Sequence, residues 1–239
     1  MPLPKISTPT YELELPSTGK TVKYRPFLVK EEKVLVIALE SEDTKQITNA
    51  IKAVLKSCVL TKGVKVETLP TFDIEYLFLN IRGKSVGEEL DVTLICPDDG
   101  KTEVPIKIDL DDIQIQKNEE HTNQIKLDDS LMMELKYPSL DEFIKSNFEF
   151  NDKNQMDQSF QLIASCIDKI YNEEEVWATA DCTKKEMNDF LESMNSSQFK
   201  EIEKFFETMP KLKHTVTITN PKTKVESEVV LEGLASFFA

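Results

Sequence analysis

The strongest constraint on the fold of this chain is the spacing of its apolar residues, which switches repeatedly between two periods. Apolar and polar residues alternate, as in half-buried strands, over 10–28, 88–116, 124–138 and 214–234. Apolar residues recur every three or four positions, as on one helix face, over 30–39, 47–58, 71–86, 157–171, 184–194 and 196–209. This alternation predicts an α+β protein in which helices pack beside short antiparallel β-hairpins.

Helix starts are indicated by capping residues. Thr71 precedes an apolar run with Asp73 in the position of a first-turn acid. Ser139 with Glu142, and Thr183 with Glu186, have the spacing of capping boxes.

The order of elements indicates two similar halves. We predict an N-terminal half over 1–116, a polar linker over 117–123 and a C-terminal half over 124–239. In each half the pattern predicts a hairpin, helices and a second hairpin, and each half contains a Lys-Tyr dipeptide shortly before a proline. Low identity between the halves leaves internal duplication and chance agreement both open.

Composition argues against several function classes. The chain has 239 residues with 43 Asp and Glu against 29 Lys and Arg, so its net charge is −14. Nucleic-acid-binding proteins carry a basic footprint, and anionic membranes repel such a charge. No apolar run reaches the roughly 18 residues of a membrane span, and the first residues do not resemble a signal peptide. The sequence therefore predicts neither a nucleic-acid partner nor a membrane span.

The cysteines predict free thiols. The chain has 4 Cys, at 58, 96, 166 and 182, without a CxxC pair. Cys58 and Cys166 fall on apolar helix faces, where buried free thiols are expected. This pattern fits a reducing compartment such as the cytoplasm.

Catalytic motifs are incomplete. Gly83-Lys84-Ser85 resembles the end of a phosphate-binding loop, but Phe78 occupies the position of the required upstream glycine. A nucleophile needs a base, usually histidine, and the 2 histidines lie in the predicted linker (His121) and at the start of the last hairpin (His214).

Metal-binding and acidic motifs are equally weak. Cys96-Pro97-Asp98-Asp99-Gly100 has the shape of a zinc-knuckle turn with one Cys, and the corresponding turn at Asn220 has none. Acidic runs at 109–112 and 173–175 match no calcium loop, and solvated surface is their simplest interpretation. A hydrolase that uses a carboxylate pair is the alternative function from another class. We predict no cofactor and no metal site.

Aromatic and arginine side chains near strand edges and at the carboxy end are the candidate partner contacts. These residues are Tyr24, Arg25, Phe27, Phe237 and Phe238. For the two C-terminal phenylalanines, docking on the chain's own core and docking on a partner both stay open.

Long phrases of the sequence resemble one protein family. They are TPTYELELPSTGKTVKYRPFLVKEEKVL, LPTFDIEYLFLNIRGKSVGE and FLESMNSSQFKEIEKFFETMPKLKHTV with LEGLASFF. They resemble the baseplate hub and hub-assembly proteins of T-even-type contractile-tailed bacteriophages, over 10–110 and 139–238.

The resemblance implies a non-enzymatic structural or assembly protein of a phage tail baseplate hub, acting through protein–protein contacts. Family members often carry Cys pairs near the two hairpin turns, and here only Cys96 remains. The expected partners are other hub or tail proteins. The expected location is the host cytoplasm during assembly and, for a retained subunit, the virion tail baseplate. A retained subunit and a transient hub-assembly chaperone both stay open.

Overall fold

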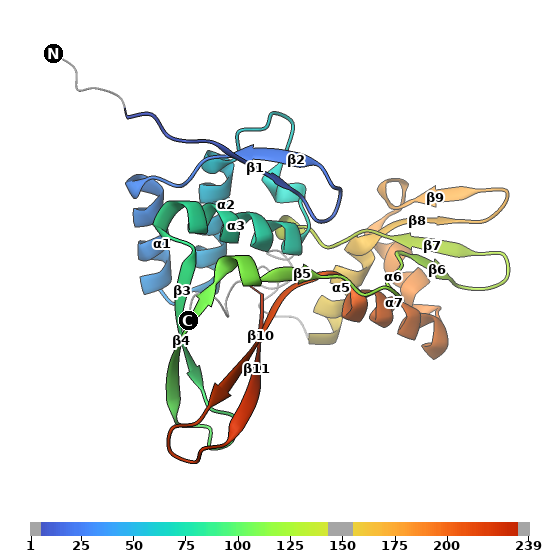
Figure 1. Ribbon diagram of the computed structural model, residues 1–239. Coiled ribbons are helices and arrows are strands. Elements are labelled where there is room, and N and C mark those ends of the chain that lie inside the picture. Colours follow the sequence, from blue (N-terminus) through green and yellow to red (C-terminus); the bar gives the residue numbers. More distant parts are fainter. Residues whose placement is uncertain (1–5, 143–154, 234–239) are drawn as a thin grey trace. The chain divides into compact units, whose positions relative to one another are not determined.

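The computed structural model describes residues 6–142 and 155–233, which form helices and small antiparallel sheets (Figure 1). The predicted α+β class is confirmed. The chain divides into two compact units. The first comprises Met1–Val66, Phe72–Gln116 and Lys211–Ala239, and the second comprises Glu67–Thr71 and Lys117–Pro210.

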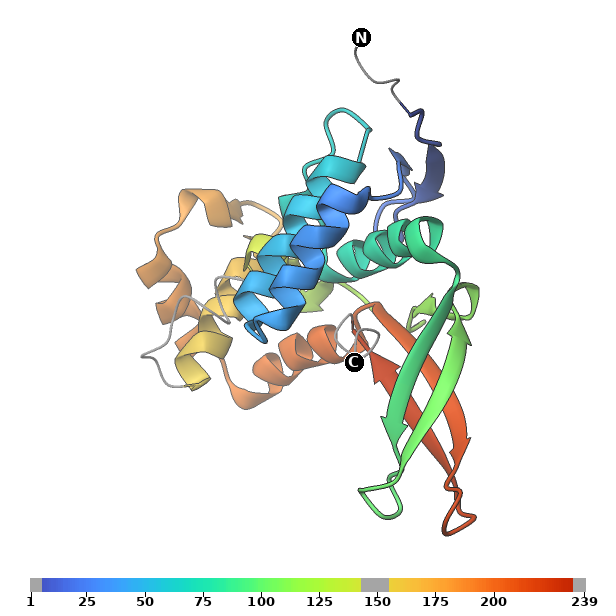
Figure 2. The same ribbon diagram turned by 90° about the vertical axis from the view of Figure 1, so that its left-hand side faces the viewer.

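The first unit opens with a hairpin and three helices. These elements are β1 (Tyr11–Glu14), β2 (Thr21–Tyr24), α1 (Val29–Glu40), α2 (Thr44–Cys58) and α3 (Thr71–Val86). Asp43 caps α2, since its carboxylate accepts hydrogen bonds from the backbone N–H groups of Lys45 and Gln46. Figure 2 shows α1 lying along α2 at the surface of this unit.

Two longer hairpins complete the first unit. Their strands are β3 (Glu89–Ile95), β4 (Glu103–Asp109), β10 (Lys211–Thr219) and β11 (Glu226–Glu232), and β10 also pairs with β5 (Gln114–Gln116). The hairpins run side by side in both ribbon views (Figures 1 and 2). Their facing apolar side chains form one buried cluster that includes Leu90, Leu212 and Ile218.

The second unit contains a four-stranded antiparallel sheet and helices. The sheet order is β6 (Gln124–Lys126), β7 (Met132–Leu135), β8 (Ile167–Tyr171) and β9 (Val176–Ala178), and the helices are α5 (Gln155–Cys166), α6 (Lys184–Glu192) and α7 (Ser196–Thr208). Met133, Ile167 and Phe205 belong to its buried core.

The structure corrects the helix predicted over 157–171. Helix α5 ends at Cys166, and residues 167–171 form β8 between β7 and β9. Ile167 and Ile170 fit the helical spacing of the preceding residues, so periodicity alone continued the helix. Pairing with β7 decides the strand, and this partner is remote in sequence.

The division into units differs from the predicted halves. The closing hairpin β10–β11, placed in the half 124–239, lies in the first unit because β10 pairs with β5 and its apolar face packs on β3–β4. Residues 117–123, predicted as a linker, belong to the second unit.

Several local predictions are confirmed. Thr183 and Glu186 form the capping box of α6, and Ser139 and Glu142 exchange both hydrogen bonds of a second box. The four cysteines are free, and Cys58 and Cys166 are buried. Within the described ranges, no helix combines the length and apolar character that crossing a membrane requires.

Candidate functional site

Tyr24 lies in the core of the first unit. Its residue is 2% exposed, its ring lies 5.8 Å from that of Tyr11, and its backbone forms a bridge to Val59. Burial raises the pKa of its hydroxyl above the ordinary value. The structure therefore places Tyr24 among packing residues, with little surface open to a partner.

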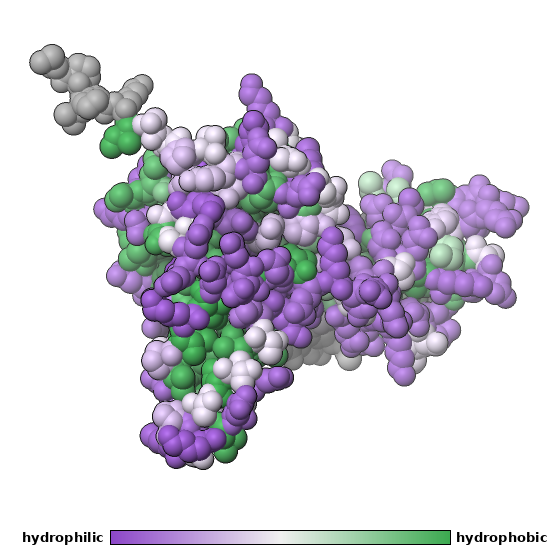
Figure 3. Space-filling view, in the orientation of Figure 1, coloured by the Kyte–Doolittle hydropathy of each residue, from purple (hydrophilic) through white to green (hydrophobic). Residues whose placement is uncertain are grey.

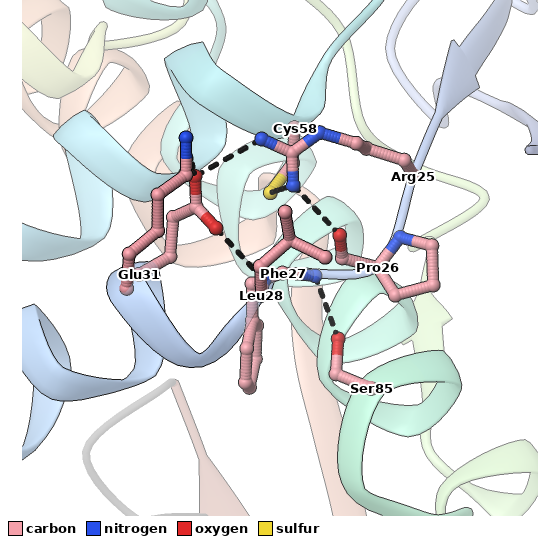
Figure 4. A network of polar contacts seen from close by, with 8 residues as sticks. Arg25, Pro26, Phe27, Leu28, Glu31, Cys58 and Ser85 are labelled. Atoms are coloured by element: carbon pink, nitrogen blue, oxygen red, sulfur yellow. Dashed lines mark hydrogen bonds and ion pairs between the residues drawn. The ribbon is translucent and has the colours of Figure 1, made fainter. Parts of the chain in front are cut away.

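Arg25 is held in a partly buried polar network between β2 and α1 (Figure 4). Its Nη2 donates to Glu31 Oε1 at 3.0 Å, and its Nη1 donates to the Pro26 carbonyl at 2.9 Å and to Cys58 Sγ at 3.7 Å. Glu31 Oε2 also accepts from the Leu28 N–H at 2.8 Å. The Arg25 and Glu31 side chains are only 15% and 6% exposed. Arg25 thus fixes the entry into α1.

The electrostatics of this network favour an ion pair and a neutral thiol. Burial by itself would raise the pKa of Glu31, but the hydrogen bonds from Arg25 and Leu28 outweigh it and hold the pKa below its usual value. Burial raises the pKa of the Cys58 thiol to about 11, so Cys58 stays protonated at neutral pH.

Phe27 is the predicted contact residue that borders a groove. Its N–H donates to Ser85 Oγ at 2.9 Å, and its half-buried side chain lines a cavity of about 300 Å³. The cavity lies among α1, α2, α3 and β3. Its lining residues include Leu35, Val36, Leu39, Ile47, Ile51, Phe78, Arg82 and Val86. Phe237 and Phe238 lie outside the described residues.

Helix α1 exposes apolar side chains beside this groove. Val29 is 79% exposed and Ile37 is 55% exposed, while only Glu31 and Ala38 of this helix are buried. In Figure 3, green residues lie among purple ones over α1. A helix with apolar residues on several faces usually lies inside a protein. The exposed apolar side chains of α1 and the apolar lining of the groove are together named here the α1 surface.

The sequence missed Arg82 as a residue of interest. Its Nη1 is covered by protein and has no hydrogen-bond partner among the described residues. Burial lowers the pKa of its guanidinium. No signal in the sequence distinguishes Arg82, because the absence of an acceptor depends on the side chains from α1, α2 and β3 that surround it.

The two long hairpins meet at their tips through hydrogen bonds. Asp98 accepts from Asn220 Nδ2 at 3.0 Å and from Thr223 Oγ1, and these bonds lower its pKa. Cys96 is buried beside this contact. In the part of the chain that the structure describes, no group of three His, Cys, Asp or Glu side chains could hold a metal. Direct hydrogen bonds therefore join these turns.

His121 packs in the second unit. Its Nδ1 lies 2.9 Å from Thr208 Oγ1 and its Nε2 lies 3.0 Å from the Tyr137 hydroxyl, while its ring lies 5.2 Å from that of Phe205. Burial lowers its pKa. These contacts give His121 a structural role.

Together these features define an α+β protein whose first unit carries an exposed apolar helix and groove, of a kind suited to contacts with another protein. A family model described as T4 bacteriophage base plate protein matches residues 8–239, and the chain belongs to this family. Membership favours a structural over a catalytic role. Neither the comparison with curated proteins nor that with solved structures gives a match.

Proposed function

We propose that this chain is a non-enzymatic structural or assembly protein of the baseplate hub and acts through contacts with other tail proteins. Family membership supports a role in the baseplate. The observation that carries the contact role is the α1 surface, where large apolar side chains such as Val29 and Ile37 are exposed. Apolar patches of this kind mark interaction sites in soluble proteins.

Charge supports a protein partner over a nucleic acid. The net charge of −14 gives no basic footprint for phosphates. The acidic runs that motivated a hydrolase, 109–112 and 173–175, have exposed carboxylates at Asp109, Asp111, Asp112 and Glu173 to Glu175. Exposed acids of this kind are those of an ordinary solvated surface, which favours the non-enzymatic role.

The test is affinity purification of the tagged chain from phage-infected cells, followed by mass spectrometry. We expect baseplate hub proteins to be recovered in fixed proportion to the chain. Recovery without any baseplate protein would contradict the proposal.

Retention in the virion is tested separately. Mass spectrometry of purified mature particles should detect the chain if it is a hub subunit. Its presence in infected cells together with its absence from particles would instead identify a hub-assembly chaperone of the host cytoplasm.

A further inference from the structure

The α1 surface combines apolar side chains with one half-buried arginine, Arg82, whose Nη1 is covered. The groove is lined by apolar side chains of α1, α2 and α3, and Arg82 on α3 is the basic residue in its lining. A buried guanidinium N–H without an acceptor costs free energy, because its hydration is lost and nothing replaces it. Arg82 Nη1 has no acceptor among the described residues.

Resting on the proposed function, we propose that the α1 surface binds an apolar helix of another baseplate protein, and that a carboxylate on this helix accepts a hydrogen bond from Arg82.

The shape of the surface favours a helix as the occupant. Helix α1 has 12 residues, which is about 18 Å of length. Its exposed Val29 and Val36 are at i and i+7, so they share one helix face, and Val36 lines the groove. An apolar helix that fills such a groove removes these side chains from water. The apolar stripe of the partner thus supplies the buried area.

Charge complementarity specifies the polar group of the partner. A carboxylate is the acceptor that pairs best with guanidinium, with a charge-assisted hydrogen bond. Glu32 and Asp91 lie at the exposed edge of the groove, so basic residues beside the partner's carboxylate would complement them.

The overall charge opposes a second copy of this chain as the occupant. Each copy carries a net charge of −14, so two copies repel one another. A less acidic baseplate protein meets no such repulsion, and we therefore assign the surface to a different protein.

The first experiment identifies what touches α1. The full chain, with a photo-reactive phenylalanine analogue in place of Ile37, is mixed with the purified baseplate hub proteins of the same phage and irradiated. We expect cross-links to a helical segment that contains Asp or Glu among apolar residues. Cross-links only between copies of this chain, only to its own residues 234–239, or only to segments without an acid would overturn the proposal.

The second experiment tests the surface and Arg82 with matched variants against the cross-linked hub protein. Val36→Lys and Val230→Lys alter valines of similar exposure, 47% and 49%, on α1 and on β11. We expect Val36→Lys to abolish binding, Val230→Lys to leave it unchanged, and Arg82→Met to weaken it about 10- to 100-fold. Arg82→Met should remain folded, because it removes the unpaired donor, and circular dichroism checks this.

A charge exchange gives the decisive outcome. Arg82→Glu should lose binding, and replacing the partner's acid with Arg should restore part of it. Binding unaffected by Val36→Lys and Arg82→Met would overturn this inference while leaving the proposed hub function intact. Absence of binding to every hub protein would instead contradict the proposed function as well.

Discussion

At the scale of single residues, the Arg25–Glu31 pair shows how burial changes the contribution of an ion pair to stability. The pair is almost covered, whereas Lys136 and Glu142, 3.9 Å apart in the second unit, are more exposed. Exposed ion pairs contribute little to stability, but a buried charge that loses its partner is left without solvation.

We expect Arg25→Met to lower the free energy of unfolding by about 2 kcal/mol, because Glu31 would lose its charge-assisted hydrogen bond and keep only the exposed Lys30 as an ionic partner. Lys136→Met is the matched control, with an expected cost below about 1 kcal/mol. Urea unfolding followed by circular dichroism measures both. Equal losses for the two variants would show that the Arg25 network contributes no more than a surface pair.

His121 predicts a dependence of stability on pH. Burial lowers its pKa in the folded chain below the ordinary value of about 6.5. The unfolded chain then binds a proton more readily, so this contribution to stability is complete above pH 6.5 and is lost as pH falls through the lower folded pKa.

The variant His121→Gln should remove this contribution. We expect the difference in unfolding free energy between the wild-type chain and the variant to shrink as pH falls from about 7.5 to about 5.5. Urea titrations across this range provide the measurement. If the unfolding free energies of the wild type and the variant change with pH in parallel, titration of His121 does not cause the pH dependence.

At the scale of elements, α3 and the two long hairpins pack at close range. Gly83 lies inside α3, where an added Cβ would come 2.9 Å from Leu110 Cδ1. From the sequence, this glycine was considered only as part of an incomplete phosphate-loop motif. The structure makes it a packing glycine, because it is buried in the last turn of α3.

We expect Gly83→Ala to destabilise the first unit by about 1 kcal/mol. Alanine gains about 1 kcal/mol in helix propensity, but overpacking against Leu110 costs about 2 kcal/mol. In the Leu110→Ala background, where the clash is absent, the same substitution should be stabilising. Thermal unfolding of the wild type, the two single variants and the double variant measures the coupling between positions 83 and 110. If Gly83→Ala lowers stability equally in both backgrounds, residue 83 does not clash with Leu110.

At the scale of the whole molecule, the predicted duplication remains a proposal with support from equivalent contacts. The Arg25 N–H donates to the Cys58 carbonyl, and the Lys136 N–H donates to the Cys166 carbonyl. Glu31 and Glu142 accept from a backbone N–H three residues earlier, at 2.8 Å in each case. We propose that β1–α2 and β6–α5 share an origin. An experimental structure in which these segments do not superpose would refute it.

The prediction for the two C-terminal phenylalanines also concerns the whole molecule. Replacing Phe237 and Phe238 with Ala should reduce co-purification with baseplate proteins and leave the thermal unfolding of the chain unchanged, if the tail binds a partner. A lower melting temperature with unchanged co-purification would assign both side chains to the core of this chain.

Local features of the fold could be predicted because they depend on near neighbours. A hairpin needs alternating side chains and a turn, and a capping box needs Thr183 and Glu186 at the right spacing. The family resemblance likewise rests on contiguous phrases, and the family is confirmed.

The α1 surface could not be predicted, since exposure depends on what packs against a helix. Valine and isoleucine are typical core residues, so the sequence suggests that Val29 and Ile37 are buried. In the structure both side chains are exposed. The same limit applies to Tyr24 and Arg25, which were proposed as contacts for their residue type. Tyr24 is buried and Arg25 is half-buried.

The sequence by itself thus determined the α+β class, most helix and hairpin positions, the free thiols and the baseplate family, because each is carried by residues close in the chain. Only the tertiary structure decided the strand at 167–171, the packing of β10–β11 on β3–β4, the Arg25–Glu31 ion pair and the exposure of α1. These depend on partners remote in sequence, whose packing and pairing energies exceed local preferences.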